Sequence, residues 1–167
     1  MKKAALIFFV AALLLGGAVL WGFMNATLDI RAEGVVPLQP QQERAELERL
    51  ARLLEISAVR GVVYDAQPLL NLDEYTVLQY TLIVRNRGLI QADMLEVQIM
   101  PVSGDVLCYS QQDAQGIDVN QGISAGPGQT IRLHCYLLTK KGTHAVRDLH
   151  VSYYVWGNPF FIKLTYG

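Results

Sequence analysis

The sequence predicts an all-β domain, an antiparallel β-sandwich preceded by an N-terminal transmembrane helix and a short amphipathic helix. Three patterns carry this prediction. Residues 4–24 hold no charge, leucines recur at helical spacing within residues 41–57, and apolar residues then alternate with polar ones up to the C-terminus. No long helical pattern separates the alternating segments, so a parallel α/β sheet is excluded.

Composition narrows the class of protein. Of the 167 residues, 51% are hydrophobic and 17% are charged, which is typical of a folded chain rather than a disordered one. Lys and Arg number 14 and Asp and Glu number 15, for a net charge of −1. Because no basic excess is available to neutralise phosphates, a dedicated nucleic-acid-binding protein is excluded.

Residues 1–24 are predicted to form a signal anchor. The run from Ala4 to Met24 contains 21 residues without a charge, and at about 1.5 Å per residue a helix of that length reaches roughly 30 Å, the thickness of a bilayer core. Lys2 and Lys3 precede the run, and positive charge on that side keeps the N-terminus in the cytoplasm. We therefore expect a single-pass protein of the bacterial plasma membrane, with lipid contact through residues 4–24 and the C-terminal domain outside the cytoplasm.

A cleaved signal peptide is the alternative. The apolar region of such a peptide is usually about 7–15 residues long and ends in small residues at the cleavage site. Here the run is longer, and Met24 places a bulky side chain where the cleavage site would need a small one. The sequence therefore favours an uncleaved anchor.

Two segments connect the anchor to the sandwich. Residues 25–40 contain Gly34 and Pro37 without a strong period and are predicted to form a juxtamembrane linker. Residues 41–57 place Leu47, Leu50 and Leu54 on one face, which predicts an amphipathic helix. That helix either lies on the following domain or forms a short dimerising coiled coil, although fewer than three heptads are present.

Residues 58–167 are predicted to form the β-sandwich domain. Apolar side chains recur there with a period of two, and Gly, Asn and Pro mark the turns between the runs. The predicted strands are Ala58–Tyr64, Val77–Arg85, Met94–Met100, Val106–Ser110, Thr130–Leu138, Asp148–Trp156 and Phe160–Tyr166.

Two stretches of this domain resemble the immunoglobulin-like and fibronectin-III-like modules of bacterial cell surfaces, with the adhesion-related CARDB class nearest in character. The first is YTLIVRNRG (Tyr80 to Gly88), an apolar strand that runs into an Asn-x-Gly turn. The second is AGPGQTIRLHCYL (Ala125 to Leu137), in which a Pro-Gly turn opens another strand. The resemblance covers about residues 60–167 and implies an immunoglobulin-like sandwich. It implies no ligand, and it carries no catalytic residues that could be transferred.

Cys108 and Cys135 both lie in predicted strands outside the cytoplasm. They either form a disulfide or remain two buried free thiols. A disulfide would stabilise the folded domain by roughly 3.6 kcal/mol in the chain-entropy model, because it closes a loop in the unfolded chain. The three histidines do not share a metal-ligand spacing, and we expect no metal, no cofactor and no catalytic residue.

The last predicted hairpin separates its aromatic residues. Tyr154, Trp156 and Phe161 fall on the face opposite the core, together with Lys163 and His150. An exposed aromatic cluster beside a cation is typical of a partner site. The alternative is that the helix at residues 41–57 covers these rings. Pro159 further indicates that the last strand is an edge strand, because proline is tolerated at an edge or at the start of a strand.

The sequence therefore predicts a non-catalytic protein-binding or assembly subunit of the cell envelope, whose partner is another envelope protein or a second copy of this chain. A carbohydrate-binding or small-ligand-binding module that uses the aromatic patch is the alternative. An extracytoplasmic enzyme is disfavoured, because the predicted loops offer only scattered Asp, Asn and Gln residues.

Overall fold

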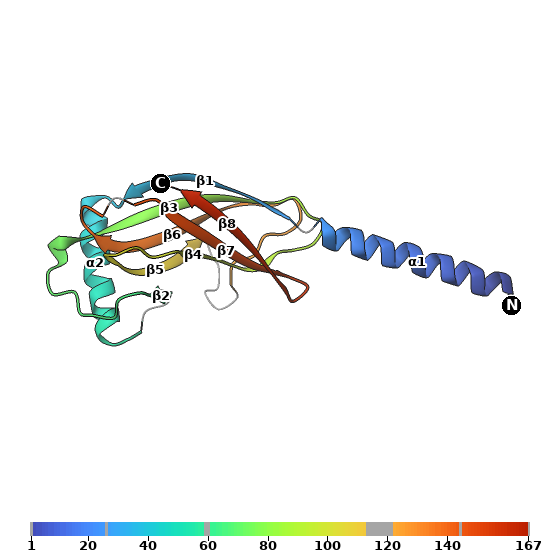
Figure 1. Cartoon of the computed structure of the whole chain (residues 1–167), viewed down its shortest axis with the longest axis horizontal. Coiled ribbons are helices and arrows are strands. Elements are labelled where there is room, and N and C mark those ends of the chain that lie inside the picture. The colour runs from blue at the N-terminus through green and yellow to red at the C-terminus, as the bar shows by residue number, and fades with distance from the viewer. Residues whose placement is uncertain (1, 26, 59–60, 113–121, 144, 167) are drawn as a thin grey trace.

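The computed structural model describes residues 2–25, 27–58, 61–112, 122–143 and 145–166. The chain is mostly β, with antiparallel sheets and an apolar N-terminal helix. Figure 1 shows an elongated β body with helix α1 projecting from one end and helix α2 lying across the other. We call these two ends of the body the α1 end and the α2 end.

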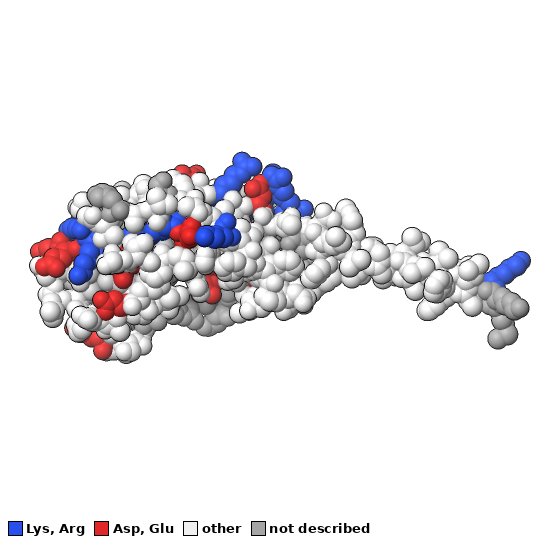
Figure 2. All heavy atoms as spheres, viewed as in Figure 1, with Lys and Arg blue, Asp and Glu red and all other residues white. Residues whose placement is uncertain are grey.

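Helix α1 spans Lys2–Met24 and is long and apolar enough to cross a membrane. Its apolar side chains are exposed along the helix, with 59% of Trp21 accessible near the C-terminal end. Figure 2 shows a helix surface without charged side chains beyond the N-terminal tip. A signal sequence near the N-terminus can also meet this criterion of length and composition, so the choice between an anchor and a cleaved leader stays a prediction.

The predicted linker over residues 25–40 is wrong for most of its length. Strand β1 occupies Leu28–Pro37 and pairs with β3 in an antiparallel register. Leu28 and Ile30 point into the core while Arg31 is exposed, which is the alternation of a strand. A bulge near Gly34 interrupts this alternation. The stretch that alternates with a period of two is therefore too short to be recognised from the sequence.

The strands form two antiparallel sheets. The first has the order β1-β3-β6-β5-β2 and the second has the order β4-β7-β8. Strand β2 is Val62–Val63, inside the predicted strand at residues 58–64, of which residues 59 and 60 lie outside the described residues. A short 3₁₀ helix, Leu72–Glu74, precedes β3. The remaining strands are β3 (Tyr75–Asn86), β4 (Asp93–Ile99), β5 (Asp105–Gln112), β6 (Thr130–Lys140), β7 (Arg147–Val155) and β8 (Asn158–Tyr166).

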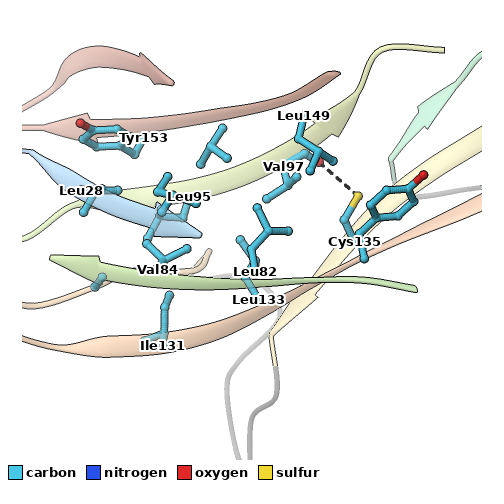
Figure 3. Packing of buried hydrophobic residues seen from close by; sticks show 14 of the residues in the cluster. Leu28, Leu82, Val84, Leu95, Val97, Ile131, Leu133, Cys135, Leu149 and Tyr153 are labelled. Carbon is cyan, nitrogen blue, oxygen red and sulfur yellow. Dashed lines mark hydrogen bonds between the residues drawn. The ribbon is translucent and has the colours of Figure 1, made fainter. Parts of the chain in front are cut away.

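The inner faces of the two sheets share one hydrophobic core. Figure 3 shows Leu82 and Leu133 of the first sheet facing Val97 and Leu149 of the second. All four are at most 1% exposed, because alternate residues of each strand point inward. The predicted alternation of the strands therefore holds across both sheets.

Helix α2 spans Pro40–Glu55 and begins at Pro40, which needs no intrahelical hydrogen-bond acceptor at that position. It packs on the outer face of the five-stranded sheet through Leu47, Leu50 and Leu54, and these leucines meet Val77 and Leu138 in a second cluster. Because the leucines are buried within the chain, they are not available to form a coiled coil. The helix is thus a third layer of the body at the α2 end.

Candidate binding surface

The β7–β8 hairpin separates its two faces as the sequence predicts. Tyr154 pairs with Pro159, Ser152 with Phe161, and His150 with Lys163. The alternate residues face the core, where Tyr153 is 2% exposed and stacks on Phe160 at 5.3 Å between ring centroids. On the outer face, Tyr154 is 39% exposed and Phe161 is 61% exposed. This outer face of the three-stranded sheet is the candidate binding surface.

Trp156 does not lie on this face, and the predicted strand through Trp156 is one residue too long. Strand β7 ends at Val155, which pairs with Asn158, so the turn consists of Trp156 and Gly157. Their φ angles are 49° and 75°. Two consecutive positive φ angles define a type I′ turn rather than the type II′ turn that Gly157-Asn158 would favour. The Trp156 side chain therefore sits at the tip of the hairpin, 57% exposed.

Lys163 belongs to the surface, but its charge has a partner. Its ammonium nitrogen lies 2.8 Å from the Asp148 carboxylate, which also accepts a hydrogen bond from the Thr165 hydroxyl at 2.6 Å. The bond from Lys163 is the main cause that holds the pKa of Asp148 below its ordinary value. The His150 ring meets the Phe161 ring edge to face, with centroids 4.8 Å apart. The surface thus changes from aromatic near the turn to polar toward the α2 end.

Strand β8 is an edge strand, as Pro159 indicates. In a hairpin with a two-residue turn, the pair that flanks the turn exchanges hydrogen bonds, and every second residue beyond it does the same. The backbone groups of Phe161, Lys163 and Thr165 therefore point away from β7. Pro159 occupies the same kind of position, where its missing N–H disrupts no bond to β7. The edge offers a row of backbone donors and acceptors to another strand.

Helix α2 does not cover the aromatic rings. It packs on the five-stranded sheet, through Val77, Leu107 and Leu138. The alternative that places the helix on Tyr154 and Phe161 is therefore wrong. The sequence does contain one indication of where α2 packs. Leu137 and Leu138 are adjacent apolar residues on opposite faces of β6, and both are buried because both faces of that strand are covered.

Cys108 and Cys135 are both buried, and the structure has no disulfide between them. The choice between a disulfide and two thiols stays a prediction. They lie on the adjacent strands β5 and β6, displaced by two residues in register. The Tyr64 hydroxyl lies 3.0 Å from the Cys108 sulfur, and the Cys135 thiol points to the Val97 carbonyl at 3.8 Å (Figure 3). Hydrogen bonds from Cys135 and from Tyr64 lower the pKa of Cys108 to about 6 against the opposing effect of burial. Both residues are at most 1% exposed in the described structure.

Within the described ranges, no group of three or more His, Cys, Asp and Glu residues is placed so that it could hold a metal ion.

Comparisons with known proteins assign no family to the chain: no family model matches it, and no curated protein matches it. One solved structure that matches the chain weakly is the FixG-related protein from Vibrio parahaemolyticus, with 13% sequence identity and a TM-score of 0.39. The match covers 83% of this chain and 92% of that one.

Proposed function

We propose that this chain is a single-pass, membrane-anchored subunit of the bacterial cell envelope, with an immunoglobulin-like sandwich outside the cytoplasm that binds another envelope protein. The supporting observation is the three-stranded sheet, which ends at the edge strand β8 and exposes Phe161 of that strand. The five-stranded sheet carries α2 on its outer face, whereas the described chain places no element on the outer face of the other sheet. We assign no catalytic role to the chain.

The edge and the face suit the same partner. A strand added to β8 would bond the outward-pointing backbone groups of Phe161, Lys163 and Thr165, and its side chains would lie beside Phe161. Natural edge strands are usually blunted by charge or by covering structure. On β8 the single charged side chain, Lys163, is already paired with Asp148. A protein segment that adds to the sheet is therefore the occupant we favour over a sugar or a small ligand.

Site-specific photo-crosslinking in native membranes tests this proposal. A photoreactive residue replaces Phe161 in the full chain, and a matched control places it at Glu48, which is exposed on α2. We expect a discrete adduct with one envelope protein from position 161 and none from position 48. An adduct with a second copy would identify self-association instead. Equal labelling from both positions, or none from position 161, would contradict the proposal.

A further inference from the structure

The α1 end of the body carries exposed apolar side chains. Leu89, in the loop between β3 and β4, is 63% exposed, Met94 of β4 is 63% exposed, and Trp156 of the β7–β8 turn is 57% exposed. Strand pairing places all three at this end, because β3 ends opposite the first residue of β1, and β4 begins opposite Tyr154, beside the turn. Figure 1 shows the tip of the hairpin at the same end as α1. We call Leu89, Met94 and Trp156 the apolar tip.

Two of these residues have a left-handed backbone conformation. Met94 has a φ of 52° and Trp156 a φ of 49°. Left-handed backbone is rare in residues with large side chains, because it brings the side chain close to the backbone. Such conformations cluster at functional sites. Here they direct apolar side chains toward solvent at one end of the body.

Contacts with α1 fix the depth of this end relative to a membrane. The rings of Phe23 and Phe160 lie 5.5 Å apart, so the last turn of α1 touches the first residues of β8. Gly22 is buried, and the nearest atom to the position of a Cβ there is Ile90 Cδ1 at 3.6 Å. Ile90 follows Leu89 directly in its loop. Both contacts fall inside the uncharged run Ala4 to Met24.

The uncharged run is only just long enough to cross the hydrocarbon layer. Its 21 residues reach roughly 31 Å, against about 30 Å for that layer, and the headgroup layer adds only about 5–8 Å on each side. When the run fills the hydrocarbon, Gly22 and Phe23 lie at its outer boundary. The body residues that touch them must then lie within the headgroup layer, and the apolar tip lies beside them.

Charge at the same end suits this position. Arg31 and Arg87 both bond the Asp29 carboxylate, so two guanidinium groups share one acid and leave a net positive charge. Figure 2 shows basic and acidic side chains on the part of the body next to α1. Anionic headgroups attract such a patch, and Trp is enriched at the interface of membranes.

We infer that the apolar tip is a second lipid-binding site, which inserts into the headgroup layer of the bilayer that α1 spans and fixes the orientation of the body. This inference rests on the proposed membrane anchor. Strand β8 then starts in the headgroup layer near Phe160 and runs away from the membrane, so that Lys163 and Thr165 of the partner surface stand above it.

The two tryptophans of the chain allow the anchor and the tip to be tested separately. The full chain is reconstituted in vesicles of phosphatidylcholine and phosphatidylglycerol, with or without lipids brominated near the headgroup end of the acyl chains. In Trp21→Phe the fluorescence reports on Trp156, and in Trp156→Phe it reports on Trp21. We expect both to lose emission in brominated lipid, and we expect Trp156 to be shielded from aqueous iodide.

The outcomes are distinct. If Trp21 is quenched by brominated lipid while Trp156 is quenched only by iodide, the anchor stands and the lipid-binding tip is overturned. If Trp21 is not quenched, both the anchor and the tip are overturned. A substitution adds a second check in the Trp21→Phe chain. Leu89→Asp should reduce the quenching of Trp156 by lipid, whereas Leu70→Asp, at a 95% exposed leucine near the α2 end, should leave it unchanged.

Discussion

The guanidinium of Arg147 forms a bidentate ion pair with the carboxylate of Asp105, with Nε 3.0 Å from Oδ2 and Nη2 2.8 Å from Oδ1. Their side chains are 2% and 0% exposed. Arg147 begins β7 in one sheet and Asp105 begins β5 in the other, so the pair links the two sheets across the core. The remaining guanidinium nitrogen donates to the Tyr80 hydroxyl at 3.4 Å and to the Ala145 carbonyl at 3.3 Å.

We predict that Arg147→Met destabilises the body by about 3–5 kcal/mol, because it leaves the Asp105 carboxylate buried without its cation. The measurement is urea unfolding of the full chain in detergent micelles. The matched control is Arg132→Met, which breaks the exposed Arg132–Glu33 pair of 3.0 Å and should cost at most about 1 kcal/mol. The double variant Arg147→Met with Asp105→Leu should regain most of the loss. Equal effects of the two single variants would contradict the prediction.

We predict that the body loses stability in acid because of Glu46 on α2. This carboxylate accepts hydrogen bonds from Arg49 Nε at 2.8 Å and from the Tyr109 hydroxyl. The bond from Arg49 is the main cause that lowers the pKa of Glu46 from its ordinary 4.5, against the opposing effect of burial. Since the native pKa lies below the unfolded one, this stabilisation is complete above 4.5 and is lost as the pH falls through the lowered native value.

The free energy of unfolding as a function of pH checks this prediction. Glu46→Gln should cost about 1 kcal/mol near neutral pH and should flatten the acid limb of the curve. Glu48→Gln, on the exposed side of the same helix, should leave the curve parallel to that of the unchanged chain. If the free energy of unfolding still falls as steeply at low pH in Glu46→Gln, then other carboxylates cause the loss of stability in acid.

We predict that the partner bonds the open edge of β8 through the backbone. Lys163→Pro removes the outward N–H at that edge and leaves the bonds to β7 in place, as Pro159 already does. It should reduce the crosslinked adduct formed from position 161. The control is Lys163→Ala, which removes the same ion pair with Asp148 but keeps the N–H. Equal adduct yields from the two variants, with unchanged circular dichroism, would mean that the partner contacts side chains and not the edge.

Sequence patterns predicted those parts of the fold that depend on local alternation. The two faces of the last hairpin follow from a period of two along β7 and β8, and the leucine spacing predicted α2 within two residues of its bounds. Strand β1 was missed because the bulge at Gly34 shortens its alternation. The position of Trp156 was predicted wrongly, because nothing about a tryptophan in a sequence indicates that its backbone is left-handed.

Features that depend on distant contacts left no such pattern. Arg147 and Asp105 are separated by 42 residues, and nothing near either one indicates the other. The apolar tip combines the loop after β3, the start of β4 and the β7–β8 turn, which come together only when the two sheets pack. A single exposed leucine in a loop, such as Leu89, is normal on a protein surface and indicates no site. Only its position at the α1 end of the body makes it part of the apolar tip.

The last prediction concerns which residues form the independently stable unit. The sequence places the sandwich at residues 58–167, but β1 and α2 precede that boundary and belong to the body. A chain that begins at Thr27 keeps both elements and should unfold cooperatively in water. A chain that begins at Ala58 loses the paired strand on β3 and uncovers Val77 and Leu138, which are now 0% exposed.

The expected loss from the shorter chain is large. Burial of a leucine contributes about 1.5–3 kcal/mol, so the loss of Leu47, Leu50 and Leu54 alone approaches the total stability of about 5–15 kcal/mol that is typical of a domain. Circular dichroism and urea unfolding of the two chains provide the measurement. Within the longer chain, Leu50→Ala should cost about 2–5 kcal/mol, while Arg52→Ala on the exposed face should cost little. If the chain from Ala58 unfolds at the same urea concentration as the chain from Thr27, then α2 and β1 are accessory elements and the boundary at residue 58 is correct.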